Sequence, residues 1–270
     1  NLGLLGFYKY GGWISASFAL GNADFFQSYV LPAGISFYTF QSMAYTIDVY
    51  RGKIEPETSL LSFCNYIAYL PQLIAGPIER FHHLAPQLEK FRAGTSTPQW
   101  TAGIDRIMLG IAQKLILADG CGYIVDRLVQ GQANDFFSAW AVGIGFGLQI
   151  YFDFAAYSHM AIGISLLLGI RLNENFLAPY QADSIQEFWR RWHITLSSWF
   201  RDYLYIPLGG SQKGILRTIF NVFITFTLCG LWHGAGFNFL LWGFLHGAML
   251  GLYHFKQLLI PGINLPKTIY

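Results

Sequence analysis

Residues 225–251 form an apolar run, TFTLCGLWHGAGFNFLLWGFLHGAMLG, that contains no Asp, Glu, Lys or Arg. A helix that crosses the hydrocarbon core of a bilayer needs about 20 mostly apolar residues. This run therefore predicts membrane-embedded structure. Composition agrees, because only 12% of the chain is charged, against about 25% in soluble domains. The mean hydropathy is +0.36. We expect an all-α, polytopic transmembrane helical bundle.

Several other apolar stretches are long enough to enter a membrane. Pro71, Gly76 and Pro77 interrupt one of them and favour a re-entrant element, while Asp153 separates two others. The predicted membrane elements are residues 4–20, 31–50, 60–78, 104–125, 136–152, 155–170, 219–231 and 237–255. We expect residues 1–270 to form a single membrane-embedded domain. The start without Met and the lack of a polar tail favour an interior fragment of a longer chain.

The placement of basic residues indicates orientation. The net charge of +2 is too small to suggest nucleic-acid binding, and none is expected. Basic side chains gather in three loops, at 80–92, 190–201 and 213–217. Positive residues near membrane ends favour the cytoplasmic side, so we expect residues 183–217 on or near the cytoplasmic face.

Cysteines and histidines give no metal or disulfide signature. Cys64, Cys121 and Cys229 lie in apolar segments without CxxC spacing, so we expect buried, unbridged thiols. HExxH is absent, and the adjacent His82 and His83 would point apart on a helix, so no metal site is expected.

Two glycine patterns favour packing over ligand binding. The GxGxG run at 143–147 follows the start of an apolar helix rather than a strand, so a dinucleotide site is not expected. Gly243, Gly247 and Gly251 are spaced four apart, which predicts a smooth helix stripe that a neighbouring helix can approach closely.

Residues 184–205, SIQEFWRRWHITLSSWFRDYLY, predict one helix. Ser184 and Glu187 fit a capping box, and Pro207 with the glycines after it marks the end. Its Trp, Tyr and Arg residues are typical of an interfacial anchor helix. On such a helix His193 would share a face with Arg190.

His233 lies inside the uncharged run, where an ionisable side chain is costly and usually functional. A neutral imidazole can accept a proton from a hydroxyl near neutral pH. A second polar group could hold the carbonyl of an electrophile, and the pair would suit acyl transfer to an alcohol. A cysteine nucleophile at Cys229, one turn earlier, is the weaker alternative because no third orienting group is evident.

Several stretches resemble the membrane-bound O-acyltransferase family, in its alginate O-acetyltransferase branch. They are FQSMAYTIDVYRG at 40–52, YLPQLIAGPIERF at 69–81, GIAQKLILAD at 110–119, QIYFDFAAYSHMAIGISLLLGI at 149–170, NFLAPYQADSIQEFWRRWHITLSSWFRDYLYIPLGG at 175–210 and LCGLWHGAGFNFLLWGFLHG at 228–247. Together they span nearly the whole chain. The resemblance implies an all-helical membrane bundle with a funnel, re-entrant elements and a thinned centre.

The resemblance also implies roles for individual residues. His233 corresponds to the family's catalytic histidine, and His193 to its second conserved position. Arg190, Arg191 and Arg201 become candidates for contacts to the phosphates of the acyl donor, with interfacial anchoring as the alternative. The donor would be a co-substrate such as acetyl-CoA, and no tightly bound cofactor or metal is expected.

The expected product is an O-acetylated exported polysaccharide such as alginate, made by a multi-pass protein of the bacterial inner membrane. Membrane lipid and periplasmic acetyltransferase subunits are the expected partners. Asp153 and Asp202 could orient a histidine or pair with an arginine, and both alternatives stay open.

One stretch departs from the branch. Ala155 and Ala156 replace a Ser-Gly pair, and His159 replaces an acid. The rival functions are D-alanyl transfer to teichoic acid, a transporter or channel with a histidine relay, and an inactive structural subunit of an export complex. An internal repeat, which transporters often carry, is not evident.

Overall fold

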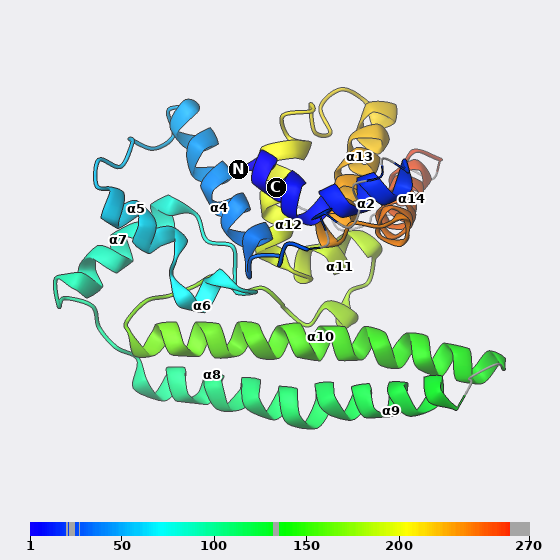
Figure 1. Ribbon diagram of the computed structural model, residues 1–270, viewed down its shortest axis with the longest axis horizontal. Coiled ribbons are helices and arrows are strands. Elements are labelled where there is room, and N and C mark those ends of the chain that lie inside the picture. The colour runs from blue at the N-terminus through cyan, green and yellow to red at the C-terminus, as the bar shows by residue number, and fades with distance from the viewer. Residues whose placement is uncertain (20, 22–24, 27, 132–134, 260–270) are drawn as a thin grey trace. The chain divides into compact units, whose positions relative to one another are not determined.

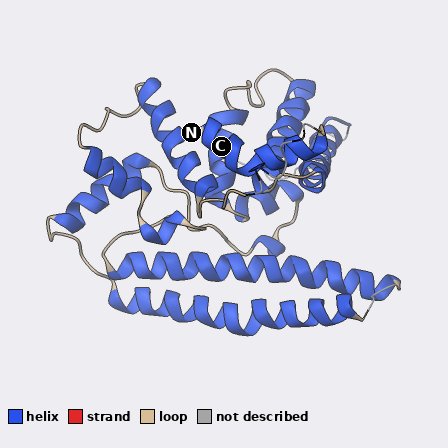
Figure 2. Cartoon of the chain, viewed as in Figure 1, coloured by secondary structure: helices blue, strands red, loops and turns tan. Residues whose placement is uncertain are grey.

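The computed structural model describes residues 1–19, 21, 25–26, 28–131 and 135–259, with the backbone alone for 257–259. Throughout these residues the regular structure is helical and contains no strand (Figures 1 and 2). The predicted all-α class is confirmed. The chain divides into two compact units, one of Asp48–Phe176 and the other of Asn1–Ile47 with Leu177–Tyr270. That the whole chain is one membrane domain stays a prediction.

Three described helices are long and apolar enough to cross a membrane: Trp100–Gln130, Phe136–Leu167 and Ile215–His233. The first two belong to the unit Asp48–Phe176. There α8 (Trp100–Ala112), the π-helical η2 (Gln113–Ala118) and α9 (Asp119–Gln130) follow one another without a break and lie along α10 (Phe136–Leu167; Figure 1).

Glycines bring α8 and α10 together. A Cβ atom added to Gly103 would lie 2.9 Å from the Gly163 carbonyl oxygen, and one added to Gly163 would lie 2.7 Å from the Gly103 carbonyl oxygen. Larger side chains at either position would push the two backbones apart.

Helix α10 corrects the prediction of two separate elements at 136–152 and 155–170. It continues through Asp153, whose carboxylate lies 2.6 Å from the Lys114 ammonium of η2. Lys114 also pairs with Asp119 at 2.8 Å. Because the charge of Asp153 is paired across the helix interface, a carboxylate need not end an apolar helix.

The prolines and glycines before residue 78 do break that stretch, as predicted. Helix α5 (Leu60–Ile67) is followed by the short α6 (Leu70–Leu73), and α7 covers Phe81–Arg92. The fully buried Glu79 ties this region to the chain after α10, since it accepts hydrogen bonds from the backbone N–H of Asn173 at 2.5 Å and from its side-chain amide at 2.7 Å.

The other unit begins with three short consecutive helices, α1 (Leu2–Leu5), the π-helical η1 (Gly6–Tyr10) and α2 (Gly11–Ser17). They follow one another without a break and cover most of the element expected at 4–20, whose last residue lies outside the described part of the chain. Helix α4 (Ile35–Tyr50) starts four residues later than predicted, after Gly34 with φ +75°.

Helices α13 (Ile215–His233) and α14 (Phe237–Leu259) form a hairpin around the predicted glycine stripe. A Cβ atom on Gly243 would lie within 3.0 Å of the Phe226 carbonyl oxygen, and one on Gly247 would lie 3.1 Å from the Phe223 Cα. The predicted role of the stripe as a close-packing surface is confirmed.

The prediction of a single helix at 184–205 is wrong. Helix α11 covers Ile185–Arg191, α12 covers Ile194–Phe200, and the π-helical η4 covers Arg201–Tyr205. The break falls at His193, whose φ of +43° is left-handed and cannot continue a right-handed helix. The predicted start is confirmed, because Ser184 accepts a hydrogen bond from the backbone N–H of Glu187 at 3.1 Å. The short 3-10 helix η3 (Pro179–Gln181) precedes it.

The prediction for the cysteines holds in part. All three are free, but only Cys229 is buried, whereas Cys121 is half-buried and Cys64 is exposed. Cys64 is on α5, which is too short for the membrane span that the burial prediction assumed.

Candidate acyl-transfer site

His233 is the last residue of α13. The helix ends there because Gly234 is extended, with φ −167° and ψ +156°. The imidazole is exposed and contacts two indoles, with its ring centroid 5.0 Å from that of Trp232 and 5.0 Å from that of Trp242. An exposed side chain that packs against two rings can meet a substrate in a fixed orientation.

His193 is the N-cap residue of α12 and is 2% exposed. Its ring centroid lies 6.1 Å from that of Trp232, on the indole that also contacts His233. Burial, and secondarily the nearby His233, lowers the pKa of the His193 imidazole well below its usual value of 6.5. The two histidines predicted from sequence therefore lie at one site, and His193 is neutral there.

The helix break changes how His193 reaches this site. A continuous helix would have placed it on a stripe with Arg190 and Ser197, but its left-handed backbone starts a new helix instead. Non-glycine residues rarely adopt this conformation, and such strained residues often cluster at functional sites.

His246 is a third histidine that the sequence analysis missed. Its ring lies 4.5 Å from Trp242 and 5.1 Å from Trp189 between centroids, so the row of rings extends from His233 through Trp242 to α11. A signal was present, because His246 is in the same uncharged run as His233 and lies four residues after Trp242, on the same face of a helix.

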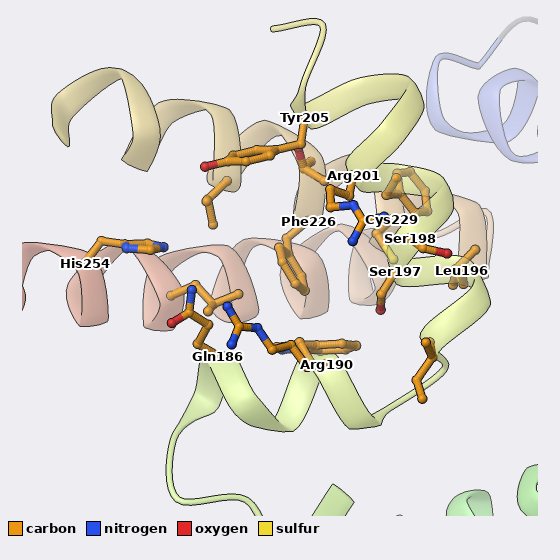
Figure 3. Close-up of a pocket in the computed structure, with 16 residues that line it drawn as sticks. Gln186, Arg190, Leu196, Ser197, Ser198, Arg201, Tyr205, Phe226, Cys229 and His254 are labelled. Atoms are coloured by element: carbon orange, nitrogen blue, oxygen red, sulfur yellow. The ribbon is translucent and has the colours of Figure 1, made fainter. Parts of the chain in front are cut away.

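A cavity of about 370 Å³ lies among α11, α12, η4, α13 and α14 (Figure 3). Arg190 extends into it from α11 and Arg201 from the start of η4. The walls are mainly apolar, and neither His193 nor His233 lines them, although Ile194 and Cys229 do. The lining residues are Gln186, Trp189, Arg190, Ile194, Leu196, Ser197, Ser198, Phe200, Arg201, Tyr205, Val222, Thr225, Phe226, Cys229, Leu250 and His254.

The three predicted arginines differ in position. Arg191 does not line the cavity, and its Nε donates to the Glu187 carboxylate at 2.8 Å. Arg190 lies 3.8 Å from the same carboxylate, and Arg201 donates to Asp202 at 2.8 Å. Asp202 thus pairs with an arginine, whereas Asp153 pairs with Lys114 in the other unit.

The alternative sites gain no support. Cys229 is free and buried, and the cavity that it lines includes neither His193 nor His233. No group of three or more His, Cys, Asp or Glu that could hold a metal lies within the described residues. His83 contacts Glu79 rather than His82.

An exposed imidazole beside a buried, neutral imidazole suits acid–base chemistry on a hydroxyl. The first can accept a proton, and the second carries one N–H that can donate to a carbonyl oxygen. The Trp232 and Trp242 indoles that contact these rings limit their motion.

Comparison with known proteins assigns the chain to a family. Residues 56–259 match the membrane-bound O-acyltransferase family. The chain belongs to this family, and it is a membrane protein.

Three relatives within the family differ in their similarity to this chain. The chain is 44% identical over 261 residues to the probable alginate O-acetylase AlgI of Pseudomonas putida, a match that covers 93% of this chain and 53% of the relative. It is 36% identical to a peptidoglycan O-acetyltransferase of Helicobacter pylori, over 94% of this chain and 53% of that protein. A teichoic acid D-alanyltransferase of Bacillus subtilis is 28% identical, over 83% of this chain and 59% of that protein. The chain thus spans about half the length of the curated relatives it matches.

Proposed function

We propose that the protein to which this chain belongs transfers acetyl groups to hydroxyls of an exported polysaccharide such as alginate, as a multi-pass protein of the bacterial inner membrane. The observation that carries the proposal is that the His233 and His193 rings both lie against the Trp232 indole, with the first exposed and the second buried. The names of the relatives support acetyl transfer to a polysaccharide more than D-alanyl transfer, because the teichoic acid enzymes are less similar.

His233 acts as the general base. Its neutral nitrogen takes the proton of the acceptor hydroxyl as the oxygen attacks the carbonyl carbon of the acyl thioester. The C–S bond then breaks, the acetyl group stays on the acceptor oxygen, and the proton passes to the departing thiolate. Such proton transfer by a positioned base contributes about 10²–10⁴-fold to the rate.

His193 polarises the carbonyl. Because its imidazole is neutral, its single N–H can donate to the carbonyl oxygen and stabilise the negative charge that develops during attack.

The acyl donor is a co-substrate such as acetyl-CoA, and the protein holds no cofactor tightly. Arg190 and Arg201 bind its phosphates from the cavity in Figure 3, because guanidinium groups suit phosphate recognition and the apolar walls can take the rest of the donor. Arg191, which is outside the cavity, anchors the helix through Glu187.

The acceptor polysaccharide approaches from the side opposite the donor. Membrane lipid surrounds the apolar helices, and periplasmic acetyltransferase subunits receive or pass on the acetylated chain. The alginate and peptidoglycan names of the relatives support the polysaccharide acceptor.

The test is a reconstitution of the full-length protein in proteoliposomes with labelled acetyl-CoA and an alginate acceptor. The proposal predicts label on the polymer. Transfer that occurs only from a D-alanyl carrier protein would instead establish the teichoic acid function. Solute flux without any acyl donor would establish a transporter. If the protein shows neither activity but restores polymer export in cells that lack it, it is a structural subunit.

A further inference from the structure

The end of α13 carries the proposed base, and of its last four residues only His233 is exposed. The last four carbonyls of any α-helix lack donors within the helix. In α13 these belong to Gly230, Leu231, Trp232 and His233. The Gly230 carbonyl accepts from the backbone N–H of Gly234 at 3.4 Å, a long hydrogen bond.

Donors from the first helices of the chain satisfy the next two carbonyls. The Tyr10 hydroxyl donates to the Leu231 carbonyl at 2.6 Å. The Lys9 ammonium donates to the Trp232 carbonyl, and also to the Ser36 hydroxyl of α4 at 2.9 Å. Consecutive residues of η1 thus bind consecutive carbonyls directly before His233.

Lys9 also contacts the ring on which the two histidines meet. Its Nζ lies 5.5 Å from the centroid of the Trp232 indole, within the range of a cation–π interaction. One ammonium therefore holds both the backbone and the side chain of Trp232.

A cation suits this position for two further reasons. The carbonyl end of a helix carries partial negative charge, which a nearby positive charge stabilises. An unsatisfied carbonyl in an apolar environment is costly, so a lysine and a tyrosine hydroxyl here resist fraying of the last turn.

We propose that Lys9 is a positioning residue for His233. With Tyr10, it fixes the last turn of α13 and the Trp232 indole, and thereby holds the His233 imidazole where it can meet the acceptor hydroxyl. This inference rests on the proposed role of His233 as the base. It concerns residues that precede the family match at 56–259.

The decisive experiment compares Lys9→Met, Lys9→Arg and Tyr10→Phe in the full-length, membrane-reconstituted protein. Lys53→Met, at an exposed lysine in the other unit, is the matched control. Two quantities are measured for each variant: kcat and KM for acetyl transfer, and hydrogen exchange of the backbone amides at 230–236.

We expect Lys9→Met to lower kcat by about 10- to 100-fold with KM changed less than about twofold, because small misplacements of a catalytic group are costly. Exchange at 230–236 should accelerate. Lys9→Arg should restore most of kcat, and Tyr10→Phe, which removes one neutral donor, should lower kcat by about two- to fivefold. If Lys9→Met does not reach the membrane, the Lys9→Arg and Tyr10→Phe variants decide by the same criteria.

Unchanged kcat in Lys9→Met, or in Tyr10→Phe where Lys9→Met is absent, would overturn the inference. A change in KM alone would also overturn it, as would a general loss of thermal stability without local acceleration of exchange. Failure of the proposed function has a different signature: the wild-type protein would then transfer no acetyl group to the polymer, while exchange at 230–236 would still accelerate in Lys9→Met.

Discussion

The arginines near the cavity in Figure 3 differ in whether their side chains face it. Arg190 and Arg201 both extend into it, while Arg191 turns to Glu187. From the sequence, all three arginines were equal candidates for contacts to the donor phosphates, because they were predicted to lie on one unbroken helix. The break at His193 separates α11 from η4, and the two arginines face one space from different elements.

The positions of the three arginines lead to a prediction for the KM of the acyl donor, in which Arg191 is the control. Arg190→Gln or Arg201→Gln should raise the KM for acetyl-CoA by about 5- to 20-fold, because each loses a charge-assisted contact to phosphate. Arg191→Gln should leave that KM within about twofold, since its side chain lies outside the cavity. Steady-state kinetics at varied donor concentration measure all three. A larger effect at Arg191 than at the other two would contradict donor binding in this cavity.

The histidines were predictable to different degrees. His233 stands out in the sequence because an ionisable group is costly within an uncharged run. His193 was found through the resemblance, but its left-handed backbone could not be predicted, since tertiary contacts rather than local preference hold a histidine at φ +43°. His246 was not predicted, because it lies on the helix whose glycine stripe indicates a packing surface.

At the scale of elements, charge pairing and glycine contacts decide where helices continue. Asp153 predicted an interruption, but its ion pair with Lys114 lets α10 run from Phe136 to Leu167. Such a pair joins residues that are 39 positions apart, so local sequence could not reveal it. The prolines at 71 and 77 act locally, and their effect was predicted correctly.

The glycine stripe gives a prediction at this scale. Gly243→Ala should destabilise the α13–α14 hairpin by about 1–3 kcal/mol, because the added Cβ would force the Phe226 backbone away. Gly143→Ala is the control, since its Cβ would meet nothing within 4 Å. It should be neutral or raise stability by up to about 1 kcal/mol through helix propensity. Thermal unfolding in detergent measures both, and equal melting temperatures would contradict the packing role.

At the scale of the whole molecule, each compact unit contains contacts between residues that are far apart in the sequence. In the unit Asp48–Phe176 the buried Glu79 accepts from Asn173, and His83 lies 2.6 Å from the same carboxylate. The hydrogen bond with Glu79 raises the pKa of His83 above 6.5, with burial acting in the opposite direction. The imidazolium is therefore stabilised in the folded state.

This shift predicts a pH dependence of stability. A histidine whose pKa is higher in the folded state contributes stability that is fully present below the unfolded pKa of about 6.5 and is lost as the pH rises through the folded value. Between about pH 6 and 9 the wild-type melting temperature should therefore fall relative to that of His83→Gln. Parallel melting curves across this range would contradict the role of the pair, and His82→Gln serves as the control at the neighbouring exposed histidine.

The family and the all-helical class were predictable for the whole chain because apolar runs and several long motifs cover it. The geometry of the site could not be predicted from the sequence. It is formed by α11, α12, α13 and α14, and no periodicity in these segments specifies their contacts with one another. The first helices were predicted only as a span, yet Lys9 and Tyr10 reach the end of α13, 223 and 221 residues away.

The most direct test of the proposed acyl transfer is the activity of His233→Ala in the full-length protein, with its abundance in the membrane measured in the same samples. Acetylation of the polymer should fall by at least about 10²-fold while abundance stays normal, because a general base contributes at least that much. His82→Ala should acetylate at the wild-type rate. Wild-type acetylation by His233→Ala at normal abundance would contradict the assignment of His233 as the base.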